Sequence, residues 1–556
     1  MKKFLSLLLA LFMVFALVGC SSTPTDTGAD SGTIITKEEN KVAGKYAGKT
    51  IILHTNDMHG GFLDSSDNDG GLEGYAAVAG AKKHFENWGA TVILVDDGDY
   101  SQGSIYVSLN QGAAATDLMD KAGYDIVGLG NHEFDYGVDS LKSIFEGKNF
   151  KVLCSNVFEG EKTLFDAEQI VKVGNLKIGF FGLETPETQT KVNPNYVKGL
   201  TFTEGQDLYD VAQKETDKLK AETDLVICLA HLGVDEESTG QRSTDVYANT
   251  TGIDFIIDGH SHTMMEAGKN GEPIQSTGTK GQYVGVIVID NATKKIERNF
   301  LYGLNNVEAD TAVLDAAQAY MKDIDEKYGA VFASTEVELV GEKAQVRAEE
   351  TNLGDLVADA MIWEVLKAGS IEVPDENLVA ITNGGGIRAT IKETGVTMKD
   401  INTVLPFGNT LAVDYCTGAE LLESLEASTY AVPDTLGGFP QVAGIEFTVD
   451  STIEYDAGEE YPDSTYCKPN SIKRVTIQSI NGKEFDENAT YAVVTNNFCA
   501  AGGDTYYAFK KAYDAGRGFD TGMVLDEVVI DYITNELGGK ITAAQYGEPQ
   551  GRITIK

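Results

Sequence analysis

The chain has 556 residues, which is more than one hydrophobic core usually serves, so at least two domains are expected. Its apolar content of 42% is typical of a globular protein. The formal net charge of −41 argues against nucleic-acid polymers and anionic lipid surfaces as partners, because those require faces rich in lysine and arginine.

The N-terminus has the pattern of an export signal. Met1-Lys2-Lys3 precede an apolar run from Phe4 to Val18, which is too short for an ordinary membrane span. The run ends in L-V-G followed by Cys20, which resembles the bacterial lipoprotein box; an ordinary signal peptide with a chance cysteine is the alternative. Residues 1–19 are therefore expected to be a lipoprotein signal peptide, and residues 20–45 a lipidated cysteine and a disordered tether. This predicts an exported protein, lipid-anchored to the cell membrane and facing outside the cytoplasm, at the cell surface or in the periplasm.

Residues 46–308 alternate strand-like runs with helical stretches and predict a first α/β domain. Five of the runs end in residues that could bind a metal. They are T-I-I-L-H-T-N before Asp57-x-His59, T-V-I-L-V-D-D-G before Asp99, Y-D-I-V-G-L-G before Asn131-His132, D-L-V-I-C-L-A before His231, and D-F-I-I-D-G before His260-x-His262. Five of the seven histidines lie in these positions. We expect them at the carboxyl ends of neighbouring strands, the edge where open α/β sheets build their sites.

These side chains predict a centre of two metal ions. Asp, His and Asn are ligands suited to Zn, Mn, Co or Fe, and the carboxylate of Asp99 could bridge two ions. A pair of ions lowers the pKa of a bound water to near neutrality and stabilises the charge that builds on a phosphoryl group. The pattern therefore indicates hydrolysis of a phosphate ester. His54, inside a strand, and His84, in a polar stretch, are expected to be structural.

Beyond the first domain the apolar positions of residues 309–329 recur every three to four residues, which predicts a single linking helix. Residues 330–556 carry their own strand-like runs, among them L-V-A-I-T-N and Y-A-V-V-T-N, and predict a second α/β domain.

The cysteines after Cys20 show no dense spacing pattern. Cys154 and Cys228 lie in strand-like runs and are expected to be buried, whereas a disulfide among Cys416, Cys467 and Cys499 stays open.

Taken together, the motifs resemble a known family. L-H-T-N-D-M-H-G at 53–60, G-D at 98–99, G-N-H-E-F-D at 130–135, A-H-L-G at 230–233 and G-H-S-H at 259–262 look like the calcineurin-type metallophosphoesterases. With N-G-G-G-I-R at 383–388, L-P-F-G at 405–408 and A-G-G-D at 501–504, the chain resembles the 5′-nucleotidase family, which includes bacterial UDP-sugar hydrolases. The likeness covers nearly everything after the tether. It implies an α/β fold with a calcineurin-like catalytic domain of β-sheets flanked by helices, a linking hinge helix and a C-terminal substrate-binding domain.

The resemblance also implies a ligand set for two divalent transition metal ions, Zn, Mn or Co. One ion would be held by Asp57, His59, Asp99 and His262, and the other by Asp99, Asn131, His231 and His260. His262 departs from the better-known relatives, which carry Gln or Asn there, and this leaves the preferred metal open. His132 and Asp135 match the family's catalytic dyad, in which the imidazolium stabilises the phosphoryl or leaving oxygens. A scaffold role for His132 is the alternative.

For the substrate, the resemblance implies that the nucleotide contacts Arg347, Asn383 and Arg388, that its base stacks between Phe407 and Phe498, and that Asp504 lies near the ribose hydroxyls. The backbone N–H groups of N-G-G-G-I-R beside Arg388 also suit phosphate or ribose. Stacking on both faces tolerates any base, so a broad nucleotide scope is expected.

We therefore expect an extracytoplasmic 5′-nucleotidase-type phosphohydrolase that removes the 5′-phosphate of nucleotides for salvage, with di- and triphosphates or UDP-sugars as further candidates. The enzymatic alternative is a 2′,3′-cyclic-nucleotide phosphodiesterase with 3′-nucleotidase activity. The alternative from another class is a solute-binding lipoprotein, which would have no reason to carry metal ligands at five strand ends. The preferred nucleotide, the native metal, the oligomeric state and the host envelope stay open.

Overall fold

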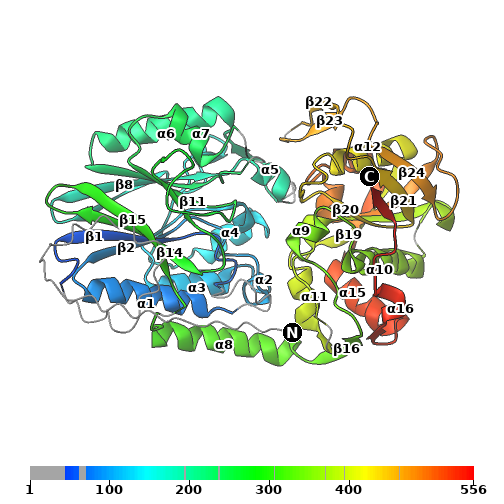
Figure 1. Cartoon of the computed structure of the whole chain (residues 1–556), viewed down its shortest axis with the longest axis horizontal. Coiled ribbons are helices and arrows are strands. Elements are labelled where there is room, and N and C mark those ends of the chain that lie inside the picture. Colours follow the sequence, from blue (N-terminus) through cyan, green and yellow to red (C-terminus); the bar gives the residue numbers. More distant parts are fainter. Residues whose placement is uncertain are drawn as a thin grey trace, which may run out of the picture.

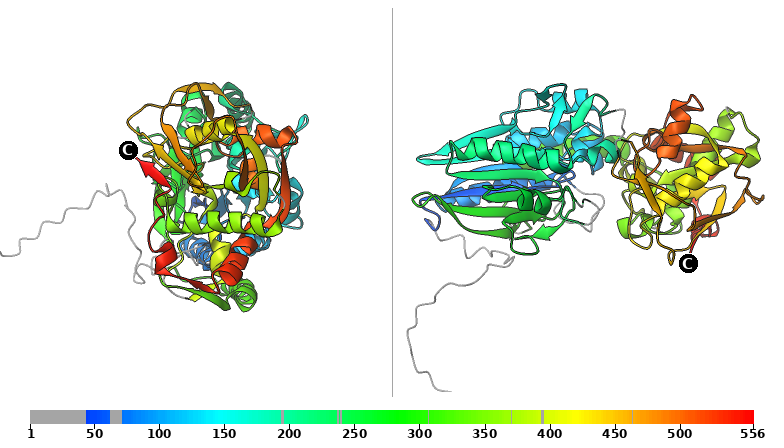
Figure 2. Two further views of the ribbon diagram at one scale, coloured as in Figure 1. Left: turned by 90° about the vertical axis from the view of Figure 1, so that its right-hand side faces the viewer. Right: turned by 90° about the horizontal axis from the view of Figure 1, so that it is seen from above.

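The computed structural model describes residues 44–61, 71–192, 196–235, 238, 240–305, 307–369, 371–392, 395–462 and 464–556. The expected signal peptide, Cys20 and most of the tether lie outside this part. Two α/β domains are joined along one edge by helix α8 (Thr311–Tyr328), as Figure 1 shows. Seen from above, they are distinct bodies that meet at a narrow interface (Figure 2). The predicted two-domain α/β architecture is confirmed.

The first domain is built on two stacked sheets of six strands each. In the first sheet the order is β15-β14-β1-β2-β3-β4, with bounds Lys295–Gly303, Tyr283–Asp290, Lys49–Thr55, Thr91–Asp96, Ile126–Val127 and Lys151–Val152. In the second it is β12-β13-β11-β10-β8-β7, with bounds Met264–Met265, Ile274–Thr277, Phe255–Asp258, Leu225–His231, Leu176–Glu184 and Glu168–Val173. Strands β1, β2 and β3 run parallel, and so do β8, β10 and β11.

The two sheets pack face to face through branched and aromatic side chains. Ile52 and Val95 of the first sheet belong to the same buried cluster as Phe180, Ile227 and Ile257 of the second. Helices cover both outer faces, so these strands are buried on both sides, which explains why their apolar runs do not alternate. The first sheet carries α1 (Glu73–Asn87), α3 (Ala113–Ala122) and α8, and the second carries α6 (Gly205–Lys220) and α7 (Ser243–Asn249).

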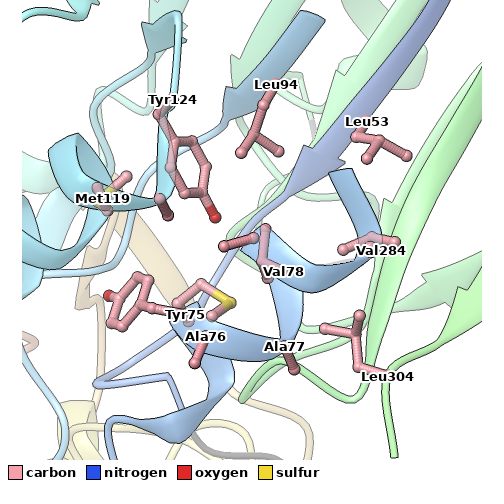
Figure 3. Close-up of a cluster of buried hydrophobic side chains, with 14 of the residues drawn as sticks. Leu53, Tyr75, Ala76, Ala77, Val78, Leu94, Met119, Tyr124, Val284 and Leu304 are labelled. Atoms are coloured by element: carbon pink, nitrogen blue, oxygen red, sulfur yellow. The ribbon is translucent and has the colours of Figure 1, made fainter. Parts of the chain in front are cut away.

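Helix α1 has the apolar face that this arrangement requires. Tyr75, Ala76 and Val78 are fully buried, and Figure 3 shows them in one cluster with Leu53 and Val284 of the first sheet. Helix α8 packs against α1. It begins after the N-cap residue Asp310 and buries Val313 and Ala317.

The strands that precede the predicted metal ligands do not all belong to one sheet. β1, β2 and β3 lie in the first sheet, whereas β10 and β11 lie in the second. The expectation of a single sheet edge is therefore wrong. The two sheets stack face to face, and this long-range packing brings one edge of each sheet to the same end of the domain. Alternation of strands and helices along the chain does not distinguish these two arrangements.

The second domain has a central sheet of five strands in the order β20-β17-β25-β19-β26, with bounds Pro440–Ala443, Leu378–Asn383, Thr490–Asn496, Thr410–Thr417 and Gly518–Val524. One face packs against α10 (Asn352–Ala368) and α15 (Leu525–Asp531), and the other against α12 (Gly418–Ser428) and α14 (Tyr507–Asp514). β17 and β25 are parallel. Asn383, the last residue of β17, and Phe498, just after β25, therefore lie at the same edge of the sheet.

The cysteines and helices of the described residues add two facts. Cys154, Cys228, Cys416, Cys467 and Cys499 are all free thiols, so no disulfide forms among the last three. Across the described ranges, no helix combines the length and the apolar content needed to cross a membrane.

Candidate active site

The seven predicted metal ligands converge at one end of the first domain. Asp57, His59, Asp99 and His262 offer ligand atoms that all lie within 4.8 Å of one another, and Asp99 belongs to a second such group with His231 and His260. The Asn131 amide oxygen lies 2.9 Å from Nδ1 of His260. The structure thus brings together two ligand groups that share the Asp99 carboxylate.

Distances inside the cluster suit bound cations. Asp99 Oδ2 lies 3.2 Å from His231 Nε2 and 3.8 Å from His59 Nε2. The Nε2 atoms of His59 and His262 approach to 3.0 Å. Nitrogen and oxygen lone pairs crowded in this way repel one another unless a proton or a metal ion lies between them, and this N/O set is the kind that first-row transition ions bind.

Backbone carbonyls fix the orientation of two of these imidazoles. Nδ1 of His59 lies 3.0 Å from the Gln102 carbonyl oxygen, and Nδ1 of His231 lies 2.6 Å from that of Asp97. A carbonyl only accepts, so each Nδ1–H donates and each Nε2 keeps its lone pair toward the cluster. His231 Nε2 is fully buried and makes no hydrogen bond of good geometry, and the Asp99 carboxylate with which it would share an ion lies 3.2 Å away. The residues present therefore fit two metal ions.

The backbone of the cluster is strained. Five of its residues have positive φ, namely Asp57 (49°), His59 (45°), Asp99 (61°), His260 (76°) and His262 (54°). Such conformations cost of the order of 1–3 kcal/mol each and persist where the surrounding structure imposes them, typically at functional sites. Position 130 requires glycine because of a close approach, since a Cβ there would lie 2.3 Å from Asp99 Oδ1.

Glu133, which was not among the predicted site residues, holds the ligand loops in place. Its buried carboxylate accepts hydrogen bonds from the backbone N–H groups of Asp99, Tyr100, Ser101 and Gly130 at 2.7–3.0 Å. It thereby ties the loop after β2 to the loop after β3. Burial raises the pKa of Glu133 to about 7. Its position in G-N-H-E-F-D, between the two members of the predicted dyad, was the available signal.

The predicted dyad is formed. His132 lies on the short helix η2 (Asn131–Phe134), and its Nδ1 is 2.7 Å from Asp135 Oδ2. Burial lowers the pKa of His132, but the charges of Asp135 and Asp99 outweigh it and raise the pKa above its usual value. The His132 backbone N–H also donates to Asp99 Oδ1 at 3.0 Å, which joins the dyad to the metal cluster.

A cavity between the domains unites the two halves of the predicted site. Its first-domain lining includes Asp99, Asn131, His132, Asp135, His260 and His262. Its second-domain lining includes all six predicted substrate residues, Arg347, Asn383, Arg388, Phe407, Phe498 and Asp504. Asp57, His59 and His231 are buried and do not line the cavity.

The second-domain wall is positively charged despite the acidity of the chain. Burial and then the like charge of Arg347 lower the pKa of Arg388 to about 10. The Arg388 guanidinium lies 5.6 Å from the centre of the Phe407 ring. Lys343, which sequence analysis did not select, lines the same cavity. Lys343 lies four residues before Arg347, a spacing that puts two side chains on one face of a helix. This spacing could have indicated from the sequence that Lys343 accompanies Arg347.

Asp504 lies beside the glycine-rich loop. Its Oδ2 accepts a hydrogen bond from Asn383 Nδ2 at 3.0 Å, and its own φ is +50°. This contact links the end of β17 to the loop after the short helix α13 (Asn497–Ala500), so these two predicted substrate residues are held together by a hydrogen bond.

Comparison with known proteins agrees with this geometry. Residues 50–264 match the family described as calcineurin-like phosphoesterase, and residues 331–511 match the 5′-nucleotidase C-terminal domain. The chain is 30% identical over 90% of its length to the trifunctional nucleotide phosphoesterase protein YfkN of Bacillus subtilis, of which it spans 34%. It is 28% identical to the 5′-nucleotidase of Vibrio vulnificus, with 97% of both proteins covered.

Among solved structures, the 5′-nucleotidase precursor of Thermus thermophilus is 29% identical with a TM-score of 0.73, covering 91% of this chain and 99% of that one. The two families match successive parts of this chain, and the relatives named above each match 90% or more of it. The chain belongs to the 5′-nucleotidase family of calcineurin-like phosphoesterase hydrolases.

Proposed function

We propose that this protein is an extracytoplasmic, dimetal 5′-nucleotidase that removes the 5′-phosphate of nucleotides. The observation that carries the proposal is the single cavity lined by the metal cluster on one side and by the predicted nucleotide-binding residues on the other. A phosphate at the metal cluster and a nucleoside on the second domain would belong to one molecule of substrate.

The metal centre would activate the attacking water and stabilise the phosphoryl group. Asp57, His59, Asp99 and His262 would hold one divalent ion, and Asp99, Asn131, His231 and His260 the other. Two such ions lower the pKa of water and neutralise charge on a phosphoryl group. Zn, Mn and Co are the candidates that the imidazole and carboxylate ligands favour.

The protein's own groups would handle the proton and the developing charge. Because Nδ1 of His132 is held by Asp135, Nε2 is the nitrogen that can donate to a phosphoryl or leaving oxygen. Arg347, Arg388 and Lys343 would offset the phosphate charge, since all three line the cavity. Phe407 and Phe498 would hold the base, and Asp504 would accept from the ribose hydroxyls.

The export signal and Cys20 support a location outside the cytoplasm with a lipid anchor. In that location, dephosphorylation would turn charged nucleotides into neutral nucleosides for salvage.

A substrate panel tests the proposal. AMP, 3′-AMP, 2′,3′-cyclic AMP, ATP and UDP-glucose are compared by kcat/KM with Mn or Zn present. We expect hydrolysis of AMP to be favoured over 3′-AMP and the cyclic nucleotide. The reverse order would assign the chain to the cyclic-nucleotide alternative. Absence of turnover with every substrate, in metal-loaded protein, would overturn the enzymatic proposal.

A further inference from the structure

A sixth strand end contributes to the metal cluster. β8 lies beside β10 in the second sheet, and its last residue, Glu184, is in register with His231. The chain then turns through T-P-E-T into the short helix α5 (Thr188–Lys191), which packs against η2. This turn buries Glu187, whose exposed fraction is 3%, at the edge of the cluster.

The carboxylate of Glu187 contacts a predicted metal ligand. Its Oε2 lies 3.2 Å from Nε2 of His260, whose other ring nitrogen, Nδ1, lies 2.9 Å from the Asn131 amide oxygen. An ionised carboxylate only accepts, so Nε2–H donates to Glu187 and Nδ1 keeps its lone pair. Two lone-pair atoms 2.9 Å apart suit ligands of the same cation, because each would lie about 2 Å from it.

His260 differs from the other imidazoles of the cluster in this respect. His59 and His231 donate their outer N–H to neutral backbone carbonyls, whereas His260 faces a carboxylate. A charged acceptor fixes the tautomer more firmly and makes the imidazole a stronger ligand, and loss of such partners typically costs about 10- to 100-fold in metal affinity.

Capping of helix α5 does not explain the orientation of the Glu187 side chain. Glu187 occupies the N-cap position of α5, but its side chain makes no capping hydrogen bond. Glu184, three residues earlier, is the carboxylate that accepts from the Thr188 hydroxyl. The Glu187 side chain is directed instead at His260.

We propose that Glu187 is a positioning residue that orients His260 and strengthens its bond to the ion shared by Asp99, Asn131, His231 and His260. This rests on the dimetal site of the proposed function. The proposal predicts that loss of the Glu187 charge lowers the affinity for one ion and leaves the affinity for the other unchanged.

Metal titration of the full mature chain tests the proposal without substrate. Metal-free wild-type protein, Glu187→Gln and Glu187→Ala are titrated calorimetrically with Mn²⁺ and with Co²⁺, and the visible spectrum of Co²⁺ reports the coordination of each site. The matched control is Glu215→Gln, because Glu215 is equally buried at 4% exposure but lies on α6 and pairs with Lys214. Circular dichroism checks that each variant folds, and the Gln variant keeps the side-chain volume.

We expect two ions per chain in the wild type and in the control. In Glu187→Gln one ion should bind about 10- to 100-fold more weakly, with a changed Co²⁺ spectrum for that ion alone. In a His260→Ala background, Glu187→Gln should have no further effect on affinity, because the group it positions is absent.

Four results would overturn the assignment. Wild-type affinity for both ions in the two Glu187 variants would give the residue no role in metal binding. Equal weakening of both ions, or additive effects with His260→Ala, would show a general structural role. A wild-type protein that binds no ion would refute the dimetal site itself. A protein that binds two ions but hydrolyses no substrate would contradict only the proposed substrate chemistry.

Discussion

The imidazole ring of His132 and the phenyl ring of Phe407 lie nearly parallel across the domain interface, with centroids 6.0 Å apart and planes inclined by 20°. His132 belongs to the first domain and Phe407 to the second, so their contact places the predicted dyad next to the wall that is predicted to bind the base. Arg388 lies against the same phenyl ring. A nucleotide bound between these walls would therefore contact both domains in this mutual orientation.

Lys399 holds that orientation on the side of the linking helix. From α11 (Met398–Val404) its ammonium reaches Tyr106 Oη at 2.5 Å and Asp325 on α8 at 3.2 Å. On another element of the first domain, the Lys191 ammonium donates to Tyr466 Oη of the second domain at 2.8 Å. These contacts are polar, as in interfaces between domains that can move relative to one another.

The first prediction concerns metal content. Purified mature protein should take up about two transition ions per chain, because two ligand groups share Asp99. Asp99→Ala should lose both ions, and His262→Ala should weaken mainly one, as measured by elemental analysis after reconstitution and desalting. His84→Ala is the control, since that imidazole packs on Trp88 and belongs to neither group. Only trace metal in the reconstituted wild type would refute the prediction.

The second prediction separates catalysis from metal binding. His132→Ala should retain both ions while kcat falls by roughly 10²- to 10⁴-fold, the scale for a lost acid–base or charge-stabilising group. The imidazole of His132 is in neither ligand group, and its backbone N–H, which contacts Asp99, survives the substitution. Turnover is measured at saturating AMP with metal content determined on the same sample. Near-wild-type turnover would leave His132 with a scaffold role only.

The strand ends of the site were predictable because they combine two strong local signals. Apolar runs of five to seven residues mark buried strands, and histidine is rare enough here that five at strand ends stand out. By contrast, Glu133 and Glu187 are two among 85 acidic residues, so their residue type alone carried little information. His54, expected to be structural, is fully buried, faces Gln275 at 3.0 Å and belongs to neither ligand group.

The division of the strands between two sheets could not be predicted for a different reason. Sheet membership depends on which strands pair across long stretches of chain, and β3 has only two residues in its ladder. Local periodicity contains no information on such pairings. The site was still predicted from the ends of the strands, because the stacked sheets bring these ends to the same place.

The third prediction concerns the anchor, which depends on sequence alone because Cys20 lies outside the described residues. Cys20→Ser should move the protein from detergent-requiring membrane fractions to soluble ones, since the cysteine is the proposed site of lipid attachment. Immunoblotting of fractionated cells measures the shift, and Cys467→Ser controls for loss of a partly exposed thiol elsewhere. An unchanged distribution would reject the lipid anchor.

The last prediction tests the division of labour between the domains. Phe407→Ala and Phe498→Ala should each weaken use of AMP by about 1–3 kcal/mol in kcat/KM, the range for one lost base stack. Hydrolysis of a small ester such as bis-p-nitrophenyl phosphate should change far less, because its phosphorus needs only the metal centre and His132.

The ratio of the two kcat/KM values distinguishes stacking from support of the fold. Phe498 is 8% exposed and belongs to a buried cluster of the second domain, so a structural role is a real alternative for it. Phe485→Ala is the control, since that ring stacks on Tyr491 and does not line the cavity. A selective loss for AMP would place the base on these rings. An equal loss for both substrates would instead show that the rings support domain closure, which is the role that the contact between Phe407 and His132 would then have.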